Sequence, residues 1–177
     1  LKATFDVVFG GTIPVGAGLS SSAALECGLA KAVNVISNLG LSDLELVKMA
    51  QKAEHEYAGV QCGIMDQYAS VFGKQNQVFK LDCRDTTHKY FPLELHDYEL
   101  ILVNTNVKHS LASSEYNLRR QECERGVHFY QSLDANIKSL RDVKRKMVED
   151  HPQQPDPISY ARSKYIVEEI ERVGQAT

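Results

Sequence analysis

The strongest constraint on the fold is a glycine- and serine-rich stretch at residues 14–24, with the sequence PVGAGLSSSAA. A β-branched run at 5–9 precedes it, and an apolar pattern with the period of a helix follows over about 21–38. This order predicts a strand, a loop and the start of a helix. Gly16 and Gly18 carry no side chain and allow positive φ, so the loop backbone can approach an anion.

The start of the predicted helix adds to this anion-binding character. The first backbone N–H groups of a helix lack an internal acceptor, and the helix dipole favours negative charge there. Ser20, Ser21 and Ser22 add hydroxyl donors, and a hydroxyl can also ligate Mg²⁺. The alternative is an ordinary helix start that a serine caps. A Walker A loop is excluded because no Lys-Ser/Thr pair follows Gly18.

The remainder of the chain predicts helices that alternate with short strands. A capping box at Ser42–Glu45 opens a helix that runs to about residue 57, and a short helix then carries Asp66 near its N-terminus. Strands are expected at 78–83 and 89–95, a buried central strand at 98–104, and helices at about 114–133, 139–150 and 158–173. The 21–38 helix is apolar nearly all round, which predicts that it is mostly buried.

Acidic residues in the first part of the chain have a functional and a structural interpretation. Glu54 lies beside the apolar stripe of the 42–57 helix, where a carboxylate needs a partner or a cation. Its alternative is an edge carboxylate satisfied by a neighbouring backbone group or lysine. Asp66 is either a functional acid or a first-turn residue that complements the helix dipole. His55 shares a charged helix face and is predicted to be solvated.

The 114–133 helix divides into an apolar and a charged side. Tyr116 lies on the apolar side, where a core position is its structural interpretation. The opposite side is predicted to face solvent and comprises Arg119, Arg120, Glu122, Glu124 and Arg125.

Composition excludes several classes of function. The net charge is −3 and the charges are mixed in sign along the chain, so no basic face for nucleic acid is expected. The four cysteines form no C-x-x-C pair and the six histidines do not cluster, so no zinc ribbon is predicted. The sequence has no secretory or membrane-spanning stretch, which indicates no membrane partner and a cytoplasmic location. Because it begins at Leu1 within a strand-like context, we expect a piece of a longer protein.

Three stretches carry a resemblance to a known family. Pro14, Gly18, Leu19 and the Ser21–Ala23 triplet match every fixed position in the phosphate-loop signature of the GHMP small-molecule kinases. Residues 62–67 (CGIMDQ), 81–84 (LDCR) and 108–116 (KHSLASSEY) resemble the galactokinase branch in particular. The N-terminal sugar-binding signature of that branch and its second glycine-rich motif are not found in the chain, so the sequence resembles the middle of such a kinase.

The resemblance implies a fold and an activity. The fold is α+β with two lobes, the first of the ribosomal protein S5 domain 2-like type, and both lobes are truncated. Residues 1–95 would belong to the N-terminal lobe and 96–177 to the C-terminal lobe. The implied enzyme is a sugar kinase that transfers the γ-phosphate of ATP, with Mg²⁺, to the anomeric hydroxyl of galactose in the Leloir pathway. It is expected to be a monomer when full length.

The resemblance also implies roles for individual residues. The ATP loop would comprise Gly16, Ala17, Gly18, Leu19, Ser20, Ser21, Ser22 and Ala23. Ser22 and Glu54 would hold Mg²⁺, and Asp66 would take the proton of the sugar hydroxyl. Gly63, Asp66 and Tyr116 would contact the sugar, and Lys108 stands where a basic residue is expected near the site.

Other functions remain open on the sequence. A kinase for N-acetylgalactosamine shares the loop and the Met65-Asp66-Gln67 core. A catalytically silent sensor of sugar and ATP would keep the same ancestry without the reaction. A third possibility is a structural fragment that associates through exposed core surface.

Overall fold

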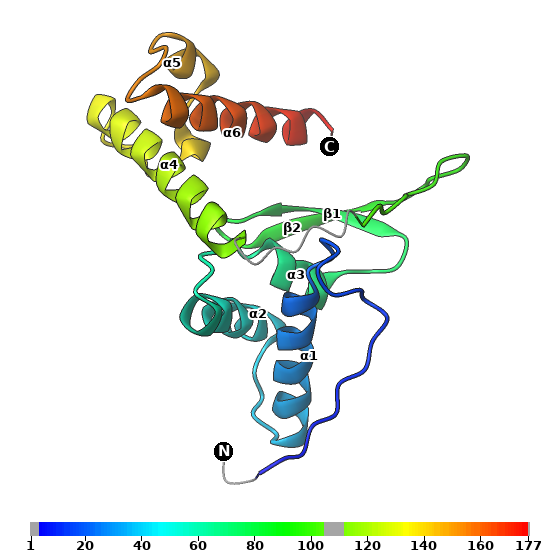
Figure 1. The fold of residues 1–177 in the computed structure, drawn as a ribbon. Coiled ribbons are helices and arrows are strands. Elements are labelled where there is room, and N and C mark those ends of the chain that lie inside the picture. The colour runs from blue at the N-terminus through cyan, green and yellow to red at the C-terminus, as the bar shows by residue number, and fades with distance from the viewer. Residues whose placement is uncertain (1–3, 105–111, 177) are drawn as a thin grey trace. The chain divides into compact units, whose positions relative to one another are not determined.

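The computed structural model describes residues 4–104 and 112–176 (Figure 1). Contacts divide the chain into two compact units, Leu1–Ser110 and Leu111–Thr177, and each is treated by itself. The lobe boundary expected near residue 95 stays a prediction. None of the helices in the described ranges is long and apolar enough to cross a bilayer.

The first unit consists of helices followed by a hairpin. Its elements are α1 (Ser21–Ile36), α2 (Asp43–Ala53), the π-helical turn η1 (Glu54–Ala58), α3 (Met65–Phe72), β1 (Gln77–Asp82) and β2 (Thr87–Pro92). The strands pair antiparallel, with Val78 opposite Phe91. The predicted helices and hairpin strands are therefore present, with ends that differ by a few residues.

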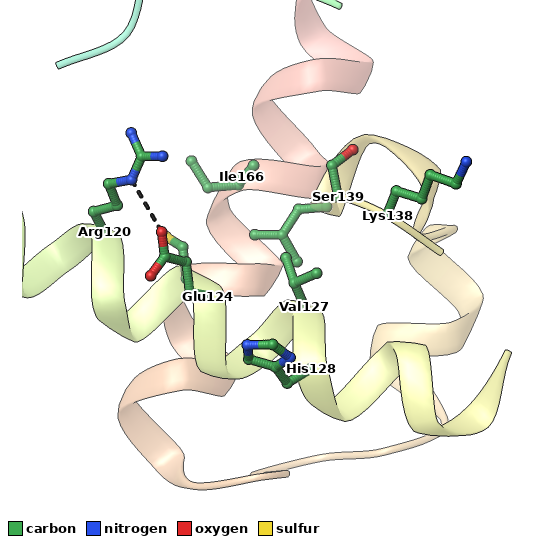
Figure 2. A pocket seen from close by; sticks show the side chains of 9 residues that line it. Arg120, Glu124, Val127, His128, Lys138, Ser139 and Ile166 are labelled. Carbon is green, nitrogen blue, oxygen red and sulfur yellow. Dashed lines mark hydrogen bonds and ion pairs between the residues drawn. The ribbon is translucent and has the colours of Figure 1, made fainter. Parts of the chain in front are cut away.

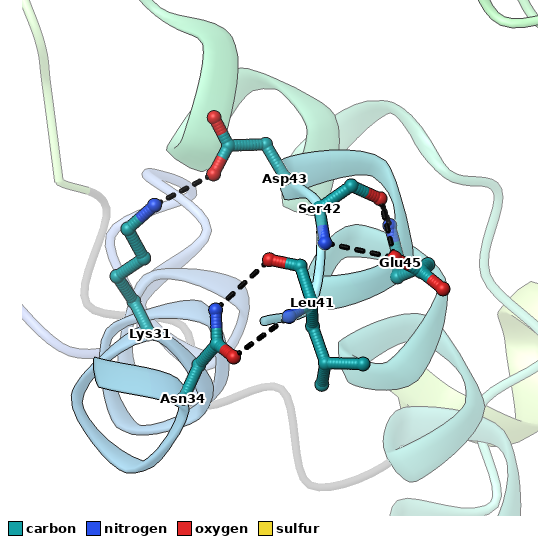
Figure 3. A network of polar contacts seen from close by, with 6 residues as sticks. All are labelled: Lys31, Asn34, Leu41, Ser42, Asp43 and Glu45. Atoms are coloured by element: carbon teal, nitrogen blue, oxygen red, sulfur yellow. Dashed lines mark hydrogen bonds and ion pairs between the residues drawn. The ribbon is translucent and has the colours of Figure 1, made fainter. Parts of the chain in front are cut away.

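The junction of α1 and α2 is held by a polar network (Figure 3). Asn34 donates to the Leu41 carbonyl oxygen at 2.9 Å and accepts from the Leu41 N–H at 3.0 Å. Ser42 and Glu45 form the predicted capping box, because the Ser42 N–H donates to the Glu45 carboxylate at 2.8 Å and its hydroxyl oxygen accepts from the Glu45 N–H. These contacts set the angle at which α2 leaves α1, and so the position at which α2 ends.

A small aromatic core fastens the hairpin to the helices. Tyr68 of α3 is 2% exposed and packs with Val47 and Ile64. The Tyr90 hydroxyl of β2 donates to the Phe72 carbonyl oxygen at the end of α3, at 2.6 Å. The packing fixes α3 against α1 and α2, which matters below because α3 carries Asp66.

Two expectations about burial and strands were wrong. Helix α1 is not mostly buried: Leu25 and Val35 are 48% and 65% exposed, since the described part of this unit packs against only one of its sides. The expected strands at 5–9 and 98–104 do not form within the described residues, and their apolar side chains are exposed. A strand requires a neighbour for its backbone hydrogen bonds, and hydrophobic composition does not supply one.

The second unit is helical. Its elements are α4 (Ala112–Leu133), the 3₁₀ turn η2 (Leu140–Asp142), α5 (Arg145–Glu149) and α6 (Pro157–Gln175). Tyr130, Val148 and Val167 lie at the centre of its core. The single helix expected at 139–150 is wrong, because Val143 takes an extended conformation with ψ 127° between η2 and α5.

Helices α4 and α6 are joined by an ion pair with a buried carboxylate, which the sequence did not suggest. Glu122 is 6% exposed, and its carboxylate accepts from the Arg162 Nε at 2.7 Å. The solvent-facing position expected for Glu122 is therefore wrong. A buried carboxylate is retained here because a guanidinium from the facing helix compensates it.

A close approach of the same two helices depends on Gly126. A Cβ at this position would collide with the Ser163 side chain and contact the Ser159 backbone. We expect Gly126→Ala to lower the free energy of unfolding by about 1–3 kcal/mol, because the buried Ser163 hydroxyl must leave its position or the helices must move apart. Urea denaturation measures this, with Gly174→Ala as the control, since a Cβ at Gly174 meets nothing within 4 Å. Equal stability of both variants would contradict the packing argument.

Candidate active site

The loop before α1 has the backbone that an anion-binding turn requires. Gly16 and Gly18 have φ of +76° and +75°, in the left-handed region that other residues rarely adopt. A Cβ at either position would meet nothing within 4 Å, so the loop lies open to solvent. Both glycines are needed for conformation, and the empty space around them leaves room for a ligand.

The N-terminus of α1 is not capped in the ordinary way. Ser20 is the N-cap residue but has φ 54°, and its side chain makes no capping hydrogen bond within the part of the chain described. The Ala24 N–H bonds to the Ser20 carbonyl at 3.0 Å, which is the first bond of the helix. The N–H groups of Ser21 to Ala23 thus precede that bond and have no helical acceptor. This geometry favours the anion-binding interpretation over a serine cap.

Glu54 lies where α2 changes its winding. The α-helical part ends at Ala53, and Glu54 opens the π-helical turn that closes at Gly59, with φ +72°. Single π turns are frequent at functional sites because they redirect a side chain out of the regular helical pattern. Glu54 is half-buried.

The Glu54 carboxyl meets a second acidic side chain, Glu26 of α1. Burial, followed by a hydrogen bond to Glu54 and the Glu54 charge, raises the pKa of Glu26 to about 7. One oxygen of each carboxylate, Oε2, is buried and finds no donor among the described residues. Ser22 is one helical turn before Glu26 on the same side of α1.

Ser22 and Glu54 offer ligand atoms of the type, and in the small number, that a magnesium ion takes from a protein. Hydroxyl and carboxylate oxygens are the ligands that Mg²⁺ prefers, and it commonly takes one or two carboxylates and keeps several waters. In the described ranges no group of three or more His, Cys, Asp or Glu side chains is arranged to hold a metal. The orphaned Glu54 Oε2 is accordingly a suitable partner for a cation that is otherwise bound by phosphate and water.

Asp66 belongs to the same region of the first unit. It is half-buried in the first turn of α3, and Figure 1 shows α3 beside the end of α1 at which the loop enters. Burial raises the pKa of the Cys62 thiol, and the charges of Glu54 and Asp66 raise it further. A hydrogen bond from Gln67 opposes part of this rise.

Several supporting residues of this region were missed from the sequence. Gln67 is 1% exposed, and its amide donates to the Cys62 sulfur at 3.8 Å. The Cys62 carbonyl accepts from the Gln51 amide at 3.1 Å and contacts the His55 Nε2 at 2.8 Å. His55 is half-buried by this contact, so its predicted solvated position is wrong. The i, i+4 spacing of Gln51 and His55 was the available signal.

The remaining predicted residues lie as follows. Gly63 is exposed, and a Cβ there would meet nothing within 4 Å, so the surface before α3 is open. Tyr116 belongs to α4 of the second unit and is 45% exposed, so a core position is excluded for it. Lys108 lies outside the described residues.

A hollow of about 470 Å³ in the second unit is a different feature (Figure 2). It lies between α4, the segment around Ser139 and α6, and none of the predicted site residues lines it. Arg120 at its edge is paired with Glu124 at 3.0 Å, as Figure 2 shows. The candidate site is therefore the loop, Glu54 and Asp66 of the first unit.

Comparisons with known proteins bear on the family of the chain. Residues 1–74 match the GHMP kinases N terminal domain. The chain is 47% identical over 161 residues to galactokinase from Thermotoga neapolitana, which covers 91% of this chain and 43% of that protein. It is 39% identical over 173 residues to galactokinase from Clostridium beijerinckii, covering 97% of this chain and 44% of the relative.

A solved structure gives the same result. Galactokinase from Lactococcus lactis, complexed with galactose, superposes with a TM-score of 0.87 at 34% identity, over 94% of this chain and 43% of that one. The predicted family resemblance and the predicted fold class are confirmed. The chain spans less than half the length of the relatives that it matches.

Proposed function

We propose that the whole protein phosphorylates galactose. The basis is that residues 1–74 match the GHMP kinases N terminal domain and that the chain is homologous to galactokinases. The γ-phosphate of ATP would pass to the anomeric hydroxyl and give galactose 1-phosphate and ADP, as in the Leloir pathway. The observation that carries the proposal is the uncapped start of α1 behind two left-handed glycines, with Glu54 and Asp66 on adjoining elements.

The loop and α1 would bind the phosphates of ATP. Residues 16–23 present backbone N–H groups and the serine hydroxyls, and the positive end of the α1 dipole lies at the same point. Phosphoryl transfer depends mostly on positioning and charge stabilisation, so such a cradle accounts for much of what a kinase site must supply.

Ser22 and Glu54 would hold Mg²⁺, and Asp66 would act on the sugar. Mg²⁺, when bound, neutralises charge on the phosphate oxygens. Asp66 would accept the proton of the anomeric hydroxyl. A carboxylate is a weak base for a hydroxyl, which suits a loose transition state in which the proton leaves late. Gly63 and Tyr116 would contact the sugar, with Lys108 near the site.

The remaining parts of the proposal rest on the sequence. We propose a cytoplasmic monomer with no nucleic-acid or membrane partner. The mixed charge of the chain supports the absence of a nucleic-acid partner.

Release of ADP from the whole protein tests the proposal. With ATP and Mg²⁺, we expect turnover with galactose and much less with N-acetylgalactosamine. A preference for the acetylated sugar would replace galactose as the substrate. Binding of ATP and galactose without any ADP would establish the silent sensor instead.

A further inference from the structure

Glu26 is the acidic residue of this region to which no role has been given. It lies on α1 one turn after Ser22, so the two side chains occupy the same side of the helix. Its carboxyl is hydrogen bonded to that of Glu54, at the start of η1. Glu26 thus connects the two residues proposed to hold Mg²⁺, which lie on different elements.

The oxygen atoms around Glu26 are short of donors. Glu26 Oε2, Glu54 Oε2 and Gln67 Oε1 are buried and have no hydrogen-bond partner among the residues described. A buried carboxylate oxygen without a donor is costly unless a proton or a cation lies beside it. Gln67 is almost fully buried, and its side chain also hydrogen bonds Glu26.

Glu54 needs such a support because of where it lies. A glutamate side chain has several rotatable bonds, and holding it in one rotamer costs conformational entropy. It also begins the π turn, where the regular helical neighbours at i+4 are displaced. Partners that hydrogen bond a metal-binding carboxylate fix its orientation and affect metal affinity strongly.

We infer that Glu26 is a positioning residue, whose carboxyl holds the Glu54 carboxylate in the orientation in which Glu54 and Ser22 take up Mg²⁺. This inference rests on the proposed function. Gln67 of α3 in turn hydrogen bonds Glu26 of α1. The Glu54 carboxylate of η1 is therefore held by residues from two other elements of the first unit.

The test measures metal affinity and not turnover. Mn²⁺, which accepts the same oxygen ligands, is titrated into the whole protein saturated with ADP, and free Mn²⁺ is followed by electron paramagnetic resonance. Glu26→Ala should weaken Mn²⁺ binding by about 10- to 100-fold. Glu26→Gln should stay within about twofold of the parent, because an amide N–H can still donate to Glu54.

Two further variants make every outcome decisive. Glu56→Gln, a control on the same π turn with an exposed carboxylate 3.6 Å from Lys52, should bind Mn²⁺ like the parent. Glu54→Gln should lose affinity; if it does not, the proposed metal site and this inference both fail. If Glu54→Gln loses affinity but Glu26→Ala does not, only the inference fails. Equal losses in Glu26→Ala and Glu26→Gln would also overturn it, because the charge and not the hydrogen bond would then matter.

Discussion

Asp66→Asn should lower kcat for galactose phosphorylation by the whole protein by about 10²- to 10⁴-fold, the range typical for loss of a general base. Asparagine has nearly the same shape as aspartate, so the first turn of α3 and its packing on α1 are retained. It cannot accept the proton of the sugar hydroxyl. The affinity for ATP should stay within about twofold, because the proposed phosphate cradle lies at the start of α1.

The measurement pairs turnover with nucleotide binding. Release of ADP gives kcat, and calorimetry with a non-hydrolysable ATP analogue gives Kd. Asp43→Asn is the matched control, since Asp43 is also a first-turn acid, on α2, and its partner Lys31 is a surface residue at 2.7 Å. A fall of less than tenfold in the Asp66 variant, similar to that of the control, would show that Asp66 only complements the helix dipole.

Local features of the fold could be predicted from the sequence because adjacent residues specify them. The capping box at Ser42 and Glu45 formed as expected, since both partners lie within one turn. The glycines at 16 and 18 took positive φ for the same reason. The strand predicted at 98–104 was wrong, because apolar side chains do not specify which strand would pair with it.

Contacts between distant residues could not be predicted in this way. In the sequence, Glu122 is one of several charged residues on the predicted 114–133 helix. It can be buried because Arg162, 40 residues later in the chain, lies beside it in the fold. Glu26 belonged to a polar stripe on α1, and its contact with Glu54 depends on how α2 returns along that helix. In the candidate site, the loop was therefore readable from local sequence, whereas the residues that support Glu54 required the fold.

Ser21→Asp should change helix stability and nucleotide affinity in opposite directions. A carboxylate in the first turn of α1 interacts favourably with the helix dipole, so the free energy of unfolding should rise by about 0.3–1 kcal/mol. The same charge would repel a phosphate at the α1 N-terminus. For two unit charges about 4 Å apart, the repulsion is about 1 kcal/mol in water and about 4 kcal/mol at an effective dielectric constant of about 20. The Kd for the ATP analogue should therefore weaken by roughly fivefold to several-hundredfold.

The opposite signs separate the two interpretations of the loop. If α1 merely begins with a serine-rich cap, an acid there raises the free energy of unfolding and leaves the affinity for the ATP analogue unchanged. If the uncapped N–H groups of Ser21 to Ala23 bind phosphate, the stabilising charge occupies the place of the ligand. Asparagine has nearly the same size as aspartate but no charge, so Ser21→Asn should keep the affinity for the ATP analogue within about threefold of the parent. Urea denaturation and calorimetry on both variants give the answer, and unchanged affinity in Ser21→Asp would remove α1 from the nucleotide site.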